Sequence, residues 1–167
     1  MTSEQIVIPI TTIEELHLAQ LVDDFVELID TSRGTEDPAI DRLTPTPYPD
    51  DPDSAAEFAD STRDDLLDRR LIEARRVRAA LGDFDGGADS LKEADALTTR
   101  ELVVPAEEID LWLRTLTAIR LVIATRLGIT SDEQTGSDGR HDVYDWLGYR
   151  LELLIQAADE AEAGLNS

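Results

Sequence analysis

The sequence contains no cysteine, a single lysine (Lys92), few aromatic residues and no long apolar run. The lack of cysteine excludes disulfide bonds, thiol catalysis, zinc sites built on thiolates and redox sensing through thiols. No uninterrupted apolar stretch approaches the length that crosses a bilayer, and the first residues lack the features of a secretory signal. These absences lead us to expect a soluble cytoplasmic protein.

Positive charge is also scarce. The 167 residues include 37 acidic and 15 basic side chains, which gives a formal net charge of −22. All of the basic residues except Lys92 are arginine. A chain this negative repels nucleic-acid phosphates and anionic membrane surfaces, whereas it favours solubility and basic protein partners. We therefore expect a protein partner, and we expect direct binding to nucleic acid to be disfavoured.

Length and hydrophobic patterning predict one domain over residues 1–167, which is long enough to bury a core. Apolar residues recur at helical spacing in four segments, namely 11–30, 54–81, 105–128 and 141–163. The predicted organisation is a short strand and helix within 1–30, a proline-rich loop over 31–53, a helix over 54–81, a linker over 82–100, and core helices within 105–163.

Two short runs rich in β-branched residues, near 5–9 and at 101–104, each lead directly into a helix with an acidic first turn. This shared arrangement predicts that they pair as a small two-stranded ribbon. A Thr-x-x-Glu capping box, beginning at Thr11 or Thr12, marks the start of the first helix. The predicted fold class is mainly α, an irregular bundle of about four main helices with a small β ribbon.

Five prolines within 38–52 predict a segment without regular helix. The alternation of proline with other residues over 45–49 is typical of a polyproline ligand. The competing interpretation is an ordered loop whose Leu43 and Tyr48 pack onto the body of the protein. We favour the ordered loop.

A cluster of arginines in the second long helix is the main concentration of positive charge. Its members are Arg69, Arg70, Arg75, Arg76 and Arg78. The cluster is our candidate interaction patch, and as a nucleic-acid patch it would lack the aromatic and amide neighbours that read bases. The interpretation that we favour pairs these arginines with nearby acids at helical spacing. Those acids include Asp64, Asp65, Asp68 and Glu73.

Arg120 and Arg126 lie in the otherwise mostly apolar stretch WLRTLTAIRLVIATRLGIT, residues 112–130. Because an unpaired buried charge is costly, we expect Arg120 to be partly buried and held by a carboxylate and by helix-end carbonyls. Glu57, flanked by apolar neighbours, is the predicted partner in this structural ion pair. The competing interpretation makes Arg120 an anion-binding residue in a cleft. Arg126, near the helix end, is expected to lie on the surface or to pin a loop.

No pattern for a catalytic or metal centre stands out. His17 and His141 are far apart in sequence, and we predict that they are unrelated surface residues rather than metal ligands. The aspartates within 83–89 do not have the spacing of an EF-hand. The chain also lacks glycine-rich phosphate loops, nucleophile elbows and zinc-binding histidine pairs. We therefore predict no metal, no cofactor and no catalytic residue.

Three blocks carry a family resemblance: DPAIDRLTPTPYPDDPDSAAEF, WLRTLTAIRLVIATRLGIT and DVYDWLGYRLELL. From Ile6 to about Ala158 the chain resembles an actinobacterial family called domain of unknown function number two thousand and seventeen. The resemblance implies a proline-punctuated loop, a long helix, a central helix and a terminal tryptophan-containing helix. It implies no activity, because none is established for the family. In the family, neighbouring genes commonly encode a Clp protease adaptor and enzymes of sulfur and cysteine metabolism. Some family members are described as transcriptional regulators.

The chain departs from the family pattern in the central helix. The family usually has Asn-Asp directly before a Leu-Arg-Leu sequence, whereas this chain has Thr117 and Ala118 at those positions. A role that depends on that amide and carboxylate is called into question for this chain.

Together, these observations predict a non-enzymatic regulatory or protein-interaction module. The acidic charge, the lack of a catalytic constellation and the resemblance to an uncharacterised family all favour it. Two alternatives stay open, namely a transcription regulator that touches DNA through the arginine cluster, and a small-ligand binder or enzyme with a cleft near Arg120. Homodimerisation through an exposed apolar helix face is also open.

Overall fold

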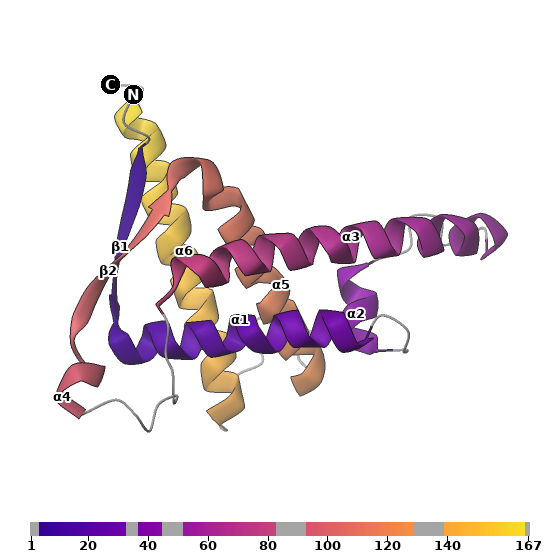
Figure 1. The fold of residues 1–167 in the computed structure, drawn as a ribbon, viewed down its shortest axis with the longest axis horizontal. Coiled ribbons are helices and arrows are strands. Elements are labelled where there is room, and N and C mark those ends of the chain that lie inside the picture. Colours follow the sequence, from indigo (N-terminus) through magenta and orange to yellow (C-terminus); the bar gives the residue numbers. More distant parts are fainter. Residues whose placement is uncertain (1–3, 33–36, 45–51, 83–92, 129–138, 166–167) are drawn as a thin grey trace.

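The computed structural model describes residues 4–32, 37–44, 52–82, 93–128 and 139–165, with the backbone alone at 52, 54–61, 93–94, 139–140 and 165. Figure 1 shows the arrangement of its helices and strands. Their bounds are β1 Gln5–Thr11, α1 Thr12–Ser32, α2 Pro38–Leu43, α3 Pro52–Ala80, α4 Glu93–Ala96, β2 Thr99–Pro105, the 3-10 turn η2 Ala106–Glu108, α5 Ile109–Leu127 and α6 Gly139–Leu165. The predicted mainly α fold, with four long helices and a small β ribbon, is confirmed.

The ribbon consists of β1 and β2, which pair antiparallel with Val7 opposite Val103. Residues alternate between two faces along each strand, so one face is buried and the other is exposed. The buried side chains are Ile6, Ile8, Ile10, Leu102 and Val104. Helix α6 packs against β1, and Arg150 of α6 donates a hydrogen bond to the carbonyl oxygen of Pro9 at 3.2 Å. The ribbon therefore closes one end of the helical core.

Helices α1 and α3 lie side by side and run in opposite directions (Figure 1). Because α3 is longer, its N-terminal part extends past the end of α1 in this view. The two helices contribute fully buried apolar side chains to a core that also includes residues of the ribbon, α2, α5 and α6. From α1 and α3 these are Leu16, Val22, Ile29, Leu67, Ala74 and Val77.

The predicted loop over 31–53 contains a short helix, α2, and the expectation of no regular helix there was wrong. Pro38 is tolerated because it occupies the first turn of α2, where a backbone N–H has no helical partner in any case. Asp37 caps the helix by accepting a hydrogen bond from the Ala39 N–H at 2.9 Å. Leu43 is buried, as expected for an ordered segment, whereas the prolines at 45–49 and Tyr48 lie outside the described residues.

The predicted linker over 82–100 also required correction, because it contains α4 and the first residues of β2. The ribbon is longer at this end than the β-branched run alone indicated. Its register continues to Thr11 opposite Thr99, and the Thr12 N–H donates to the Thr98 carbonyl at 3.0 Å. Thr11 and Glu14 form the predicted capping box, with reciprocal contacts of 3.3 and 3.4 Å.

Helix α5 is the centre of the bundle. It packs against α6, α2 and α3, which agrees with the prediction of a core helix in this segment. The predicted start at 105 is early, because Pro105 ends β2 and a 3-10 turn precedes the helix. Gly128 ends α5 with a φ of 71°, in the left-handed region that favours glycine. In the part of the chain that the structure describes, no helix is long and apolar enough to cross a membrane.

Candidate functional site

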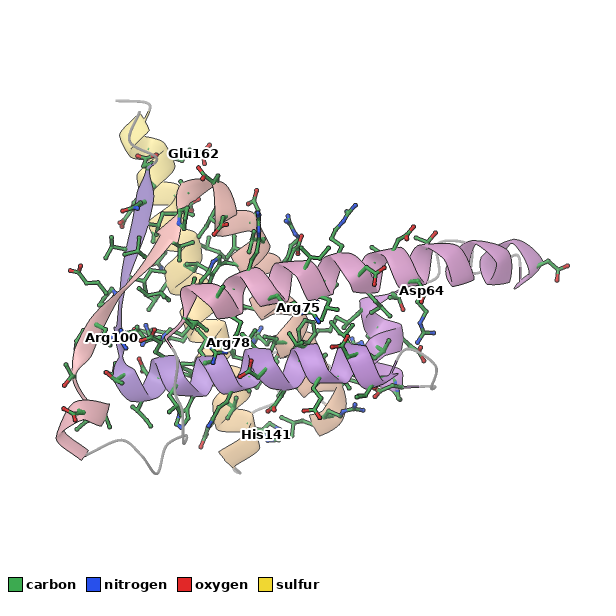
Figure 2. All side chains as sticks on the ribbon, in the orientation of Figure 1. Asp64, Arg75, Arg78, Arg100, His141 and Glu162 are labelled. Atoms are coloured by element: carbon green, nitrogen blue, oxygen red, sulfur yellow. The ribbon has the colours of Figure 1, made fainter. Side chains whose placement is uncertain are left out.

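The arginine cluster of α3 is largely held by carboxylates from other elements. Arg78 Nε lies 3.0 Å from Asp23 Oδ1, and Arg75 lies 3.6 Å from Asp30 Oδ2. Figure 2 shows both arginines in the space between α3 and α1. Pairing with acids was predicted, but for these two arginines the partners come from α1. The reason is the antiparallel packing of α1 and α3, which places acidic positions of α1 beside the cluster.

The remaining three arginines of the cluster differ in their surroundings. Arg76 lies 3.8 Å from a carboxylate oxygen of Glu108. Arg70 is half-buried, its Nη1 donates to the Arg114 carbonyl at 3.5 Å, and burial lowers the pKa of Arg70. Arg69 is exposed. Three of the five arginines therefore lie beside carboxylates that partly offset their charge, which counts against the DNA-binding alternative.

A hollow of about 640 Å³ lies between α3 and α5, beside this cluster. Its charged lining is mixed in sign: three arginines and three acids, namely Arg69, Arg70, Arg114, Asp65, Asp68 and Glu73. Glu73 accepts hydrogen bonds from both Nε and Nη2 of Arg114, at 3.1 and 2.9 Å. This bidentate ion pair raises the pKa of Arg114. With three arginines and three acids, the lining of the hollow carries little net charge.

Arg120 lies half-buried between α5 and α6. Its guanidinium carbon is 3.9 Å from the centroid of the Tyr144 ring, and its Nε donates to the Tyr144 carbonyl oxygen at 3.3 Å. Gly148 allows this close approach, because a Cβ there would lie 2.9 Å from Nη2 of Arg120. The side chain of Glu57, the predicted partner, lies outside the described residues. The guanidinium is thus partly buried and held by a carbonyl and a ring of α6, whereas the ion pair with Glu57 stays a prediction.

Arg126 is exposed, which agrees with the expectation of a surface position, and it contacts the start of α2. Its Nη2 lies 2.6 Å from Oδ2 of Asp37, the residue that caps α2. The hydrogen bond from Arg126 lowers the pKa of the Asp37 carboxyl, so the carboxylate stays charged. A second contact joins the same helices, because Nη1 of Arg42 donates to Oγ1 of Thr125 at 3.4 Å. The C-terminal turn of α5 therefore holds α2 in place.

In the described part of the chain, a groove also runs along the seam of α5 and α6. It consists of two adjoining hollows of about 340 and 410 Å³, which share Ile155. One hollow lies at the end next to the ribbon, and the other contains Arg120. Apolar side chains from β1, α5 and α6 line much of both hollows: Ile6, Ile109, Leu113, Leu121, Leu151, Ile155, Ala158 and Ala161. We call this surface the α5–α6 groove.

Carboxylates dominate the charge of the α5–α6 groove. They are the exposed side chains of Glu4, Asp110, Glu152, Asp159 and Glu162. Figure 2 labels Glu162 near the end of α6 that lies beside the ribbon. The one basic residue among the lining side chains is Arg120, which is already engaged with Tyr144. The groove is therefore apolar at its base and strongly negative at its edge.

The histidines lie on separate helices, His17 exposed on α1 and His141 near the start of α6. Figure 2 shows His141 at the opposite end of α6 from Glu162. Among the described residues, no group of three or more histidines and acids is placed to hold a metal ion. The acids of the α5–α6 groove thus form an extended rim and not a metal-binding cluster.

A protein-family model described as "Domain of unknown function (DUF2017)" matches residues 1–158. The chain belongs to this family. No curated protein and no solved structure matches the chain. The resemblance seen in the sequence is therefore confirmed, and the DUF2017 match brings no activity with it.

In this DUF2017 member, Thr117 and Ala118 have different surroundings. Thr117 is exposed and lines the hollow that contains Arg120. Ala118 is 2% exposed and packs in the core. The side chain at 117 therefore shapes the α5–α6 groove, whereas the small side chain at 118 fits the interior of the bundle.

Sequence reasoning missed two acids that fasten the start of α1. Glu15 is 5% exposed, and its Oε1 accepts a hydrogen bond from the Gly82 N–H at 3.0 Å. Glu14 pairs with Arg150, so the capping box of α1 is also tied to α6. The capping pattern predicted the local role of Glu14, but the residues that reach it across the fold gave no local signal.

Proposed function

We propose that this DUF2017 protein is a non-enzymatic interaction module that binds a protein partner in the α5–α6 groove. The observation that carries the proposal is the groove itself, in which an apolar base adjoins a rim of exposed carboxylates. Interfaces combine an apolar centre with a polar, accessible rim in the same way. The described residues supply both on one continuous surface.

The charge of the chain supports a protein partner over nucleic acid. A net charge of −22 opposes binding to a phosphate backbone. The arginines that would have to overcome it, Arg75, Arg76 and Arg78, lie beside carboxylates. In the described part of α3, three of the five cluster arginines thus have a carboxylate neighbour, which counts against the transcription-regulator alternative.

A second candidate is a small-ligand binder or enzyme centred on Arg120, and the hollow of about 410 Å³ beside this residue is what favours it. Against it, the guanidinium already stacks on Tyr144 and donates to the carbonyl of the same residue. An anion would have to compete with these contacts. We therefore place Arg120 in the structural support of the groove.

We extend the proposal to a regulatory role in the cytoplasm, where a protein with no cysteine and an acidic surface is chemically suited to act. Homodimerisation is the competing assembly. Association of two copies brings together two chains of −22 each, and this repulsion opposes the dimer.

The test is affinity capture from a lysate of the source organism with three baits: wild type, Ile155→Asn and Ile72→Asn. Both isoleucines are exposed, 47% and 60%, but Ile155 lies in the α5–α6 groove and Ile72 lies on α3. We expect at least one protein to be captured by wild type and by Ile72→Asn and to be lost with Ile155→Asn. Capture of nucleic acid alone, or an identical set of proteins on all three baits, would contradict the proposal.

A further inference from the structure

We infer that the occupant of the α5–α6 groove is a basic amphipathic helix of a partner protein. The inference rests on the proposed function and specifies the chemistry of its partner. It follows from three properties of the groove: the spacing of the residues that line it, its length, and the sign of its charge.

Spacing comes first, because it decides the shape of the occupant. The α6 residues that line the groove include Gly148, Glu152, Ile155, Asp159 and Glu162, at alternating steps of four and three. Positions that recur in this way form a nearly straight row along one side of a helix.

The α5 wall shows the same pattern. Its lining residues include Asp110, Leu113, Thr117, Leu121 and Ala124, at steps of three and four. Two such rows on antiparallel helices border a straight channel, and a third helix can lay one row of side chains into it.

Length is consistent with a helix of ordinary size. The lining residues of α6 extend from Tyr144 to Glu162, which corresponds to about 27 Å of helix axis. A partner helix of about 18 residues, or five turns, would fill the channel from end to end. Two hollows that meet at Ile155 provide places for apolar anchors on successive turns of the partner.

Charge decides the composition of the partner's polar face. Within the described part of the chain, Glu4, Glu152, Asp159 and Glu162 make no ion pair. Asp110, at the same rim, acts electrostatically on Arg114 without a direct salt bridge among the described residues. Lysine or arginine on the polar face of the partner would meet these carboxylates, which speeds association and fixes register.

The same charge argues against a second copy of this chain as the occupant. The rim carboxylates would face the surplus acids of another molecule with a net charge of −22. A metal ion does not fit either, since no group of acids in the described residues is placed to hold one. A basic helix satisfies both the apolar base and the negative rim.

The test uses designed peptides of about 18 residues, labelled for fluorescence anisotropy, with the full-length protein. The probe carries leucines at steps of three and four and lysines elsewhere. One control peptide has glutamates in place of the lysines, and another has the residues of the probe in an order that destroys the apolar row. We expect the basic amphipathic peptide to bind and both controls to bind at least tenfold more weakly.

Matched protein variants separate the groove from general attraction between opposite charges. Asp159→Lys with Glu162→Lys reverses two exposed acids at the groove, three residues apart on α6. Asp24→Lys with Glu27→Lys reverses two exposed acids at the same spacing on α1, outside the groove. We expect at least tenfold weaker binding with the α6 variant and a change of less than about threefold with the α1 variant, while circular dichroism confirms that both are folded.

Equal weakening by the two variants would overturn the inference, because binding would then reflect net charge alone. Equal binding of the basic and acidic peptides would also overturn it, as would a wild-type dimer, detected by light scattering, that the α6 variant abolishes. If Ile155→Asn loses a captured protein while the basic peptide fails to bind, the proposed function stands and the basic helix is wrong. If the basic peptide fails to bind and Ile155→Asn captures the same proteins as wild type, the proposed function and the basic helix are both wrong.

Discussion

Replacing Gly148 with alanine tests how Arg120 is held between α5 and α6. A Cβ at position 148 would lie 2.9 Å from Nη2 and 3.1 Å from both Cζ and Nε of Arg120. Contacts this short are strongly repulsive, so the guanidinium would have to move. Its stacking on the Tyr144 ring, at 3.9 Å, and its hydrogen bond to the Tyr144 carbonyl, at 3.3 Å, would be disturbed together.

The size of the effect follows from these two contacts. A cation–π contact of a partly buried arginine contributes about 0.5–2 kcal/mol. A hydrogen bond from a charged donor contributes about 1.5 kcal/mol, and the long distance here places it at the low end. Alanine is favoured over glycine inside a helix by about 0.5–1 kcal/mol, which offsets part of the loss. Complete loss of both contacts would give a net cost of about 1–3 kcal/mol. Because the guanidinium is the far end of a flexible side chain and can shift, we expect Gly148→Ala to lower the free energy of unfolding by about 1 kcal/mol, at the low end of this range.

Urea denaturation followed by circular dichroism measures this free energy, with the denaturant slope compared to confirm two-state behaviour. Gly164→Ala is the matched control on the same helix, because a Cβ there would meet no atom within 4 Å. It should leave stability unchanged or raise it slightly. In an Arg120→Ala background, Gly148→Ala should become stabilising. If Gly148→Ala matches Gly164→Ala in the wild-type background, Arg120 does not depend on the close approach to α6, and the reasoning fails.

Three further predictions concern single side chains. Thr115→Val should leave the free energy of unfolding unchanged or raise it by up to about 1 kcal/mol in the same urea assay, because the Thr115 hydroxyl is buried without a hydrogen-bond partner in the described structure. A clear loss of stability would mean that the hydroxyl has a hydrogen-bond partner, and the reasoning would be wrong. Arg126 lowers the pKa of Asp37 from 3.8, so Arg126→Leu should lose the stability that this pairing contributes. The difference in unfolding free energy between wild type and Arg126→Leu should be constant above about pH 5 and shrink as the pH falls through the pKa of Asp37 in the folded protein. Acid titrations of both proteins measure this difference, and a difference that widens in acid would refute the pairing. Arg78→Ala should cost about 1 kcal/mol of stability in thermal unfolding, because it loses Asp23 and the Gly82 carbonyl, whereas exposed Arg69→Ala should stay within about 0.5 kcal/mol of wild type; equal effects would refute the difference in their surroundings.

Much of the fold could be predicted because its signals are local. The periodic apolar residues of the four long helices, the capping box at Thr11 and the stop at Gly128 each involve neighbours within about one helical turn. Helix α2 was missed because its proline content suggests a loop, and because its capping residue is held by a residue far away in the sequence. Asp37 is held by Arg126, 89 residues further along the chain. Sequence patterns carry no direct record of such a contact.

The candidate site was harder to predict than the fold. The arginine cluster was visible in sequence, but its acidic partners Asp23 and Asp30 lie on another helix. The expected partners were neighbours at helical spacing, which is the sole pairing that a single sequence can indicate. The unusual position of Arg120 was also visible, whereas its contacts with Tyr144 and Gly148 depend on how α6 crosses α5.

The sequence by itself determined the chemistry that this chain can use: no thiol, a net charge of −22, four amphipathic helices and a short ribbon. Composition and local spacing are sufficient for these properties, since they involve residues close along the chain. Tertiary structure alone decided which charges are neutralised and where the apolar and acidic surfaces meet. The α5–α6 groove exists because two antiparallel helices place rows of residues from distant segments along one seam, and a single sequence does not reveal that alignment.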